Sequence, residues 1–237
     1  MAYSAAAPFL PALHQQVRRD LFDIVRSLPG KPALLDVGGR KSHYTVGLRA
    51  DVVVSDIPRE SGVQEELHLG VTDSIVAQTL SRRSNIRSVV IDDMTQSKLP
   101  DAAYDVVAAI EVLEHVDEDS EFVRQVKRVL RPGGVFYMTT PNGETVPNRN
   151  ADHKRHYTRQ QLEAKLREWF SDVDVYYGIE TGKLHHRSIR SWNMRHPIET
   201  VVTMAAGALH GMQSRQAAIR EQPHGTHHLF AVARKPR

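Results

Sequence analysis

Short apolar runs alternate with longer amphipathic stretches along most of the chain, and this alternation predicts strands followed by helices. Apolar runs of strand length occupy residues 33–37, 51–56, 88–92, 104–110, 135–140, 173–178 and 227–233. Helical spacing of apolar positions is found at residues 8–28, 41–49, 73–83, 120–130 and 158–170. Because strands that alternate with helices pair in a sheet with helices on its faces, the pattern predicts an α/β fold.

Specific residues mark several helix boundaries. The helix at 120–130 runs into Arg131-Pro-Gly-Gly134, where proline and glycine prevent its continuation. Thr158 is followed three residues later by Gln161, the pattern of a capping box, so a helix is predicted to begin there. The helix at 8–28 ends at Pro29-Gly30. It either packs on the sheet or lies across a ligand site as a lid.

Composition narrows the class of protein. With 237 residues, of which 41% are hydrophobic, the chain can form one α/β core with elaborations. It has no cysteine and no signal-peptide pattern, so we expect a cytoplasmic protein without disulfides. The apolar patch at 201–212 contains His210 and is shorter than the roughly 20 residues that cross a bilayer. We therefore expect no membrane span. A net charge of +3 is too small to indicate nucleic acid as a partner.

Acidic residues and glycines follow the predicted strands. The first strand leads into Asp36-Val-Gly-Gly39, and Asp56 closes the second strand twenty residues after Asp36. Glycines let a loop approach a ligand closely, and an acid at the end of the second strand can accept both hydroxyls of a ribose. Asp92-Asp-Met94 closes the third strand. Together these positions predict a nucleotide-like ligand at one edge of the sheet.

The string Glu111-Val-Leu-Glu-His115 follows the fourth strand and brings two carboxylates and an imidazole to the same edge. If the chain turns helical from Glu111, spacings of three and four residues place Glu111, Glu114 and His115 on one helix face. A site of this composition favours acid–base or metal chemistry. The alternative is an ordinary helix start with acids near its positive end.

Taken in order, these motifs and Leu130-Arg-Pro-Gly-Gly134 resemble those of class I S-adenosylmethionine-dependent methyltransferases over roughly residues 30–178. The resemblance implies a Rossmann-like, doubly wound, seven-stranded sheet whose last strand is antiparallel. It also implies that Asp36, Gly38 and Gly39 form the loop facing the methionine part of the cofactor. The chain departs from the family's loop in having Arg40 and Ser42 where further glycines are usual.

The other cofactor contacts follow from the same resemblance. Asp56 would bind the ribose, and Asp93 with the Met94 backbone would read the adenine. Glu111 is a further candidate for cofactor contact.

The Glu-x-x-Glu-His string is shared with ubiquinone-biosynthesis O-methyltransferases and with small-RNA 2′-O-methyltransferases, and the latter also have a later His in a similar Asp-His-Lys context. This resemblance implies a divalent ion, one of Mn, Fe, Co, Zn or Mg, held by Glu111, Glu114, His115 and His153. Without a metal, a histidine would act as general base. The candidate catalytic residues are His115, His153 and His156.

Residues 179–226 are too long for an ordinary loop, and we predict a substrate-recognition insertion there. Six Lys or Arg and one acid, Glu199, lie between Lys183 and Arg220. Arg187, Arg190, Trp192 and Arg195 would contact an acidic or sugar-like acceptor, or form a solvated cap. The apolar helix expected at 201–209 could make a homodimer contact.

The predicted organisation is an N-terminal helix at 1–30, a cofactor-binding core at 31–178, the insertion at 179–226 and a final core strand at 227–237. The function favoured is O-methylation of a hydroxyl on a small molecule or glycan. The alternatives are an RNA 2′-O-methyltransferase and a catalytically silent scaffold.

Overall fold

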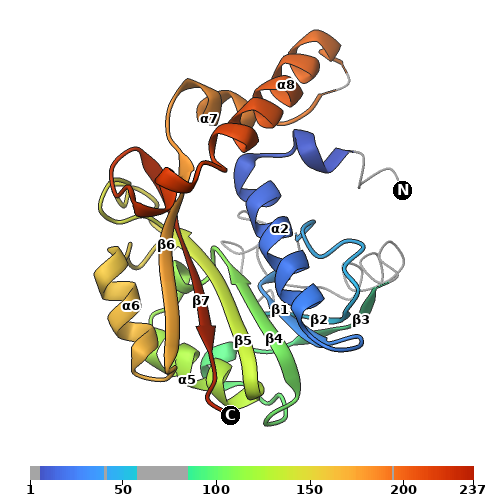
Figure 1. Ribbon diagram of the computed structural model, residues 1–237, viewed down its shortest axis with the longest axis vertical. Helices are drawn as coiled ribbons and strands as arrows, with labels where there is room; N and C mark the ends of the chain where they lie inside the picture. The colour runs from blue at the N-terminus through green and yellow to red at the C-terminus, as the bar shows by residue number, and fades with distance from the viewer. Residues whose placement is uncertain (1–5, 40–41, 58–84, 194) are drawn as a thin grey trace.

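A computed structural model describes residues 6–39, 42–57, 85–193 and 195–237 (Figure 1). Its centre is a seven-stranded sheet with the order β3-β2-β1-β4-β5-β7-β6. β7 is antiparallel to both of its neighbours, and the other paired strands are parallel. The predicted sheet with an antiparallel last strand is confirmed. The strands are β1 (Ala33–Val37), β2 (Asp51–Asp56), β3 (Ile86–Ile91), β4 (Tyr104–Ile110), β5 (Leu130–Pro141), β6 (Asp172–Glu180) and β7 (Thr226–Arg234).

Helices cover both faces of the sheet. On one face α2 (Ala12–Ser27) buries Val17, Leu21 and Val25, which are spaced by four residues and so share one side of the helix. On the other face α5 (Asp119–Val129) and α6 (Arg159–Arg167) pack on the second core cluster. Figure 1 shows α2 on the opposite side of the sheet from α5 and α6. The fold is therefore doubly wound, as predicted.

Strand order reverses between β1 and β4, because β1 pairs with β2 on one side and with β4 on the other. In open α/β sheets ligands bind outside the carboxyl ends of the strands at such a reversal. The short 3₁₀ helices η3 (Met94–Gln96) and η4 (Leu113–His115) follow β3 and β4 at this edge. The topology thus directs attention to the ends of β1 to β4.

The helix predicted at 41–49 is wrong over its described residues. Residues 44–47 form turns, in which Val46 N–H donates to His43 O and Leu48 N–H donates to Thr45 O. Gly47 has a φ of +75°, which a right-handed helix does not allow. The helix predicted at 73–83 lies outside the described residues. The other predicted helices are present, and Thr158 forms the predicted capping box with Gln161.

Two segments distant in sequence form one additional layer. It contains η1 (Ala7–Phe9) and the start of α2 on one side, and α7 (Lys183–Ser188) and α8 (Pro197–Gln213) on the other. The short helix η5 (Ala217–Glu221) packs on β6. Gln15 Nε2 donates to Gly207 O at 2.9 Å, and a Cβ on Gly207 would lie 2.4 Å from Phe9 O. Glycine is thus required for this approach. Figure 1 shows α7 and α8 beyond one end of the sheet, next to the start of α2. Within the described ranges, no helix has the length and apolar character needed to cross a bilayer.

Candidate active site

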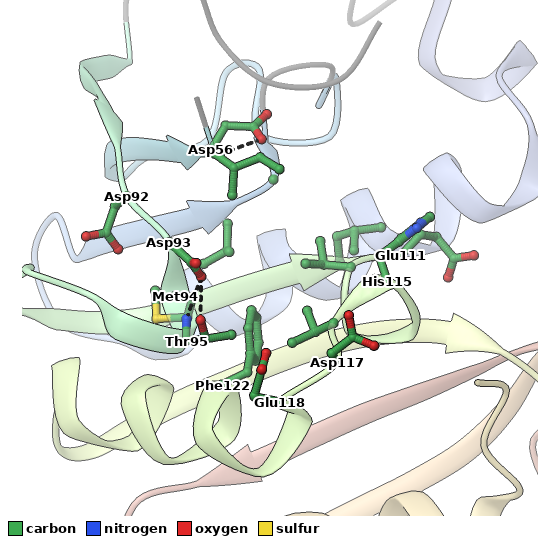
Figure 2. Close-up of a pocket in the computed structure, with 16 residues that line it drawn as sticks. Asp56, Asp92, Asp93, Met94, Thr95, Glu111, His115, Asp117, Glu118 and Phe122 are labelled. Carbon is green, nitrogen blue, oxygen red and sulfur yellow. Dashed lines mark hydrogen bonds between the residues drawn. The ribbon is translucent and has the colours of Figure 1, made fainter. Parts of the chain in front are cut away.

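A cavity of about 370 Å³ opens at the carboxyl ends of β1 to β4 (Figure 2). Its wall combines carboxylates with apolar side chains, a composition that suits a ligand with polar groups on a flat apolar body. In Figure 2, Asp56, Asp92 and Asp93 lie toward one end, and Glu111 and His115 toward the other. The lining residues are Val37, Gly38, Asp56, Ile57, Asp92, Asp93, Met94, Thr95, Ile110, Glu111, Val112, His115, Val116, Asp117, Glu118 and Phe122.

The loop after β1 approaches the cavity through Gly38. This residue has a φ of +67°, and a Cβ there would lie 2.9 Å from a methyl carbon of Val112. Asp36 is fully buried, and its carboxylate accepts a hydrogen bond from the Ser42 hydroxyl. A Cβ on Gly39 would lie 2.2 Å from that carboxylate. Of the three predicted loop residues, Gly38 therefore lines the cavity. Asp36 and Gly39 lie behind it and hold the loop in place through the contacts just described.

Carboxylates at or just after the ends of β2 and β3 lie at the end of the cavity opposite Glu111 and His115 (Figure 2). Asp56 lies at the end of β2, where its Oδ1 accepts from the N–H of Ile57. Asp92 accepts from Lys98 N–H through Oδ1, and its buried Oδ2 has no hydrogen-bond partner within the described part of the chain. A buried acceptor without a donor is costly unless a ligand or water supplies one. Asp92 therefore has a carboxylate oxygen open to a ligand, in addition to the neighbouring Asp93 that the sequence interpretation named.

Asp93 is largely occupied by its own loop. Its carboxylate accepts from the backbone N–H and the hydroxyl of Thr95, at 2.9 and 2.8 Å, and so caps η3. Burial opposes ionisation, but these bonds and one from Gln96 outweigh it and lower the pKa of Asp93. Met94 is buried in the cavity wall beside it.

Glu111 does not begin a helix, which corrects the interpretation of this string. Its φ is +54°, and the chain becomes helical only at η4, for three residues. Its carboxylate accepts from the Thr139 hydroxyl at 2.8 Å, and its Oε2 lies 3.3 Å from His228 Nε2. Burial would raise the pKa of Glu111, but His228 and Thr139 prevail and lower it. Glu111 is held as a carboxylate at the cavity wall.

Glu114, His115 and His153 form a compact group beside the cavity. One ligand atom from each lies within 4.8 Å of the others. Glu114 is fully buried, and neither of its carboxylate oxygens has a hydrogen-bond partner among the described residues. Burial and the nearby charge of Glu111 raise the pKa of Glu114 well above its ordinary value. Glu111 stands outside this group, so three of the four predicted metal ligands come together.

The loop that carries His153 is anchored on both sides. Lys154 N–H donates to Glu114 O at 2.7 Å, and Tyr157 OH donates to Asp119 at the start of α5. Gly143 after β5 contacts the same loop so closely that a Cβ would lie 2.8 Å from two of its carbonyl oxygens. Three distant segments thus fix the position of His153.

Hydrogen bonds determine which imidazole nitrogen is free. His156 Nδ1 faces Val146 O at 2.8 Å and must carry the proton, so its Nε2 accepts from His153 Nδ1, also at 2.8 Å. His115 Nδ1 faces Asp152 O at 3.2 Å and must also carry a proton. This leaves the Nε2 lone pairs of His115 and His153 free. Burial and the neighbouring imidazoles lower the pKa of His153.

Comparisons with known proteins agree with this geometry. A model of the family "Methyltransferase domain" matches residues 64–138. A probable S-adenosylmethionine-dependent methyltransferase of Mycolicibacterium smegmatis is 34% identical over 105 residues, which cover 44% of this chain and 41% of the relative. A ubiquinone biosynthesis O-methyltransferase of Paraburkholderia phymatum is 33% identical over 147 residues, 57% of this chain and 56% of the relative.

Among solved structures, a SAM-dependent methyltransferase from Archaeoglobus fulgidus superimposes with a TM-score of 0.58 at 15% identity, covering 94% of each chain. The fold and the partial sequence matches are those of class I S-adenosylmethionine-dependent methyltransferases. The sequence matches span about half the length of the curated relatives or less. The residues matched by the family model include β3, β4 and most of β5, and the similar proteins use S-adenosylmethionine.

Sequence reasoning missed His228, because nothing in the order of motifs connects the last strand of the methyltransferase with Glu111. β7 pairs His228 with Pro141 at the end of β5, which brings the imidazole to the ligand edge. The neighbouring His227 stacks on His185 of α7, with ring centroids 4.6 Å apart. The paired histidines at the start of an apolar strand were the available signal. Arg190, Trp192 and Arg195 do not line the cavity and are exposed.

Proposed function

We propose that the chain transfers a methyl group from S-adenosylmethionine to a hydroxyl of a small molecule or glycan. The observation that carries the proposal is the group Glu114, His115 and His153 at the edge of the cavity. A hydroxyl is a poor nucleophile until its proton is removed or its pKa is lowered, and this group can do either. The similarity to a ubiquinone biosynthesis O-methyltransferase supports the same reaction.

The acidic end of the cavity would hold the cofactor. Asp56 would accept the two ribose hydroxyls, and Asp92 offers an unpartnered oxygen to a donor such as the adenine amino group. Met94 would pack against the purine, while Gly38 lets the backbone approach the methionine part. When bound, S-adenosylmethionine supplies a sulfonium methyl group that is already reactive. The protein therefore has to orient the acceptor, exclude water and remove one proton.

The imidazole and carboxylate group fits a divalent metal. The free Nε2 atoms of His115 and His153 and the unpartnered carboxylate of Glu114 supply three ligand atoms, and the Nδ1 protons are held by other groups. Mixed nitrogen and oxygen ligands suit Mn, Fe, Co or Zn, while Mg favours oxygen. Such an ion would lower the pKa of the acceptor hydroxyl and orient it. In the absence of metal, His153 Nε2 is the base with a free lone pair.

Glu111, which lines the cavity next to the group of Glu114, His115 and His153, would orient the acceptor. Its carboxylate lies between the cavity and His228, and it is held by Thr139. Selection among acceptors is proposed for residues 179–226, since α7 from this segment contacts the histidines of β7. We also propose a cytoplasmic location, because the chain has no cysteine and needs no oxidising compartment.

Methyl transfer to a panel of phenols, sugars, amines and short RNAs tests the proposal. Radiolabelled S-adenosylmethionine would report transfer, and mass spectrometry would identify the methylated atom. The expected result is an O-methyl product whose formation falls after chelation and recovers with Mn²⁺. Transfer only to amines would contradict O-methylation, and transfer only to RNA would replace the acceptor class. Undiminished activity in a protein shown by elemental analysis to lack metal would assign proton removal to a histidine.

A further inference from the structure

The described chain gathers its exposed large apolar side chains in one segment. Seven of the nine lie between Ile189 and Met212. Within α8 their spacing places them on one side of the helix, and Ile198 and Met212 are 80% and 64% exposed. The seven are Ile189, Trp192, Ile198, Val201, Val202, Leu209 and Met212, and we refer to them as the α8 face.

The fold does not need this face. The opposite side of α8 is buried through Thr203, Ala206 and His210, and it packs on η1, α2 and α7. His210 Nε2 donates to Glu180 O at 2.7 Å, which fixes the helix to the end of β6. The helix is therefore already held on one side, and a row of apolar side chains points outward. An apolar row of this kind marks a docking surface.

The charge around the α8 face is basic. Lys183, Arg187, Arg190, Arg195 and Arg215 lie between residues 183 and 215, against the single acid Glu199. Arg220 instead pairs with Asp174 of β6. Arg190 and Arg195 are exposed just before α8, beside the exposed Trp192. A helix with an apolar side, flanking arginines and a tryptophan has the composition of segments that lie in the interface of an anionic membrane.

We propose that the α8 face docks on an anionic phospholipid surface, with α8 parallel to the membrane plane. A second copy of the chain fits the charges poorly. Pairing two α8 helices in parallel would place Arg195 near Arg195, and antiparallel pairing would place it near Arg215, with only Glu199 to compensate. Phosphate headgroups complement the arginine side chains. The inference goes beyond the proposed methyl transfer and does not depend on it.

Vesicle flotation of the full chain tests this docking. Vesicles of phosphatidylcholine alone are compared with vesicles that also contain phosphatidylglycerol, at low and high salt. We expect binding to the anionic vesicles only, weakened by salt because headgroup attraction is screened. The double variant Arg190→Gln/Arg195→Gln should partition about thirtyfold more weakly, since each basic residue near the surface contributes about 1 kcal/mol. Arg87→Gln, an exposed arginine on the edge strand β3, serves as the matched control.

A second variant, Val201→Glu/Leu209→Glu, removes the apolar contact at two exposed positions and should abolish flotation. Thermal melting confirms that each variant is folded. The proposal is overturned if the unaltered chain ignores anionic vesicles, or if both double variants bind as it does. It is also overturned if light scattering shows a dimer that Val201→Glu/Leu209→Glu dissociates while vesicles capture nothing.

Discussion

The two ends of the ligand edge are built differently. At the end formed by β1 to β3, carboxylates are held by neighbours in sequence, as Asp93 is by Thr95 and Asp36 is by Ser42. At the end formed by β4, β5 and β7, partners come from far apart, as with Glu111 and His228. The first end is therefore built from contacts that are local in sequence, and the second from contacts between distant strands. A cofactor that many enzymes share can be bound by a local motif, whereas a particular acceptor requires side chains that only the fold brings together.

We call the end formed by β1 to β3 the cofactor end, and the end formed by β4, β5 and β7 the acceptor end. The strongest test of this contrast removes one proposed metal ligand, the Glu114 carboxylate, at the acceptor end. Glu114→Gln keeps the shape of the side chain but replaces the carboxylate of the proposed metal site with an amide. We expect methyl transfer to fall by roughly two orders of magnitude or more, since Lewis-acid stabilisation is worth several kcal/mol. Affinity for S-adenosylmethionine should not change, because Glu114 does not line the cavity.

We also expect Glu114→Gln to lower the metal content. Steady-state kinetics, calorimetry and elemental analysis on the same preparation would measure turnover, cofactor affinity and metal content. Glu118→Gln is the matched control, because Glu118 lines the cavity but is not part of the proposed metal site. If Glu114→Gln kept full activity and the same metal content, the acceptor end would have no metal role.

At the cofactor end we expect a substitution to weaken cofactor binding and to leave the metal content unchanged. Asp56→Ala should weaken binding of S-adenosylmethionine and of its demethylated product by about 1.5–3 kcal/mol, the range for hydrogen bonds to a charged group. Its metal content should equal that of the unaltered chain. Isothermal calorimetry measures the affinity, and Asp117→Ala at the rim of the cavity provides a comparison. An unchanged affinity in a folded Asp56→Ala variant would refute the ribose assignment.

A smaller effect on catalysis is expected from the two residues that hold Glu111, His228 and Thr139. His228→Gln removes the imidazole beside Glu111 and should lower kcat/KM for the acceptor by about tenfold, the order expected for one charge-assisted bond. Thr139→Val should act in the same direction by removing the hydroxyl donor. If both residues act through Glu111, the double variant will lose less than the two single effects combined. A fully additive result would show that they do not share Glu111 as a target.

The smallest effect is expected at Asp20 of α2, away from both ends of the ligand edge, and it concerns stability rather than catalysis. Asp20 is partly buried and accepts from Tyr137 OH and Tyr176 OH, and burial raises its pKa above the ordinary 3.8. The folded state therefore binds this proton more tightly than the unfolded state. As a result, the free energy of unfolding should fall as pH rises above about 4, until the folded carboxyl is ionised. Denaturant unfolding at several pH values should show this slope, and Asp20→Asn should reduce it without changing kcat. Equal slopes would contradict the assignment.

The sequence predicted the features that depend on nearby residues. Periodicity located all seven strands, and the Thr158 cap was identified from two side chains three residues apart. It failed at 42–49, where apolar spacing resembled a helix but the chain turns with Gly47 in the left-handed region. It also failed at Glu111, because a positive φ for a glutamate is imposed by tertiary contacts.

The acceptor end was only partly predictable for the same reason. The Glu-x-x-Glu-His string indicated the correct region, but separation of Glu111 from Glu114 depends on Thr139 and His228 in other strands. No local pattern encodes a pairing between residues more than a hundred positions apart. Asp92 was set aside in favour of Asp93 because spacing alone does not tell which carboxylate its own loop occupies.

The position of β7 has a consequence for synthesis of the chain. This strand leaves the ribosome after the other six strands, yet it lies between β5 and β6 and pairs with both. Until it is in place, β5 and β6 have unpaired edges that can associate with other chains. The same strand carries His228 to Glu111. A truncated or stalled chain is therefore expected to aggregate and to lack an ordered acceptor end, so that the site becomes complete only in a chain that has finished folding.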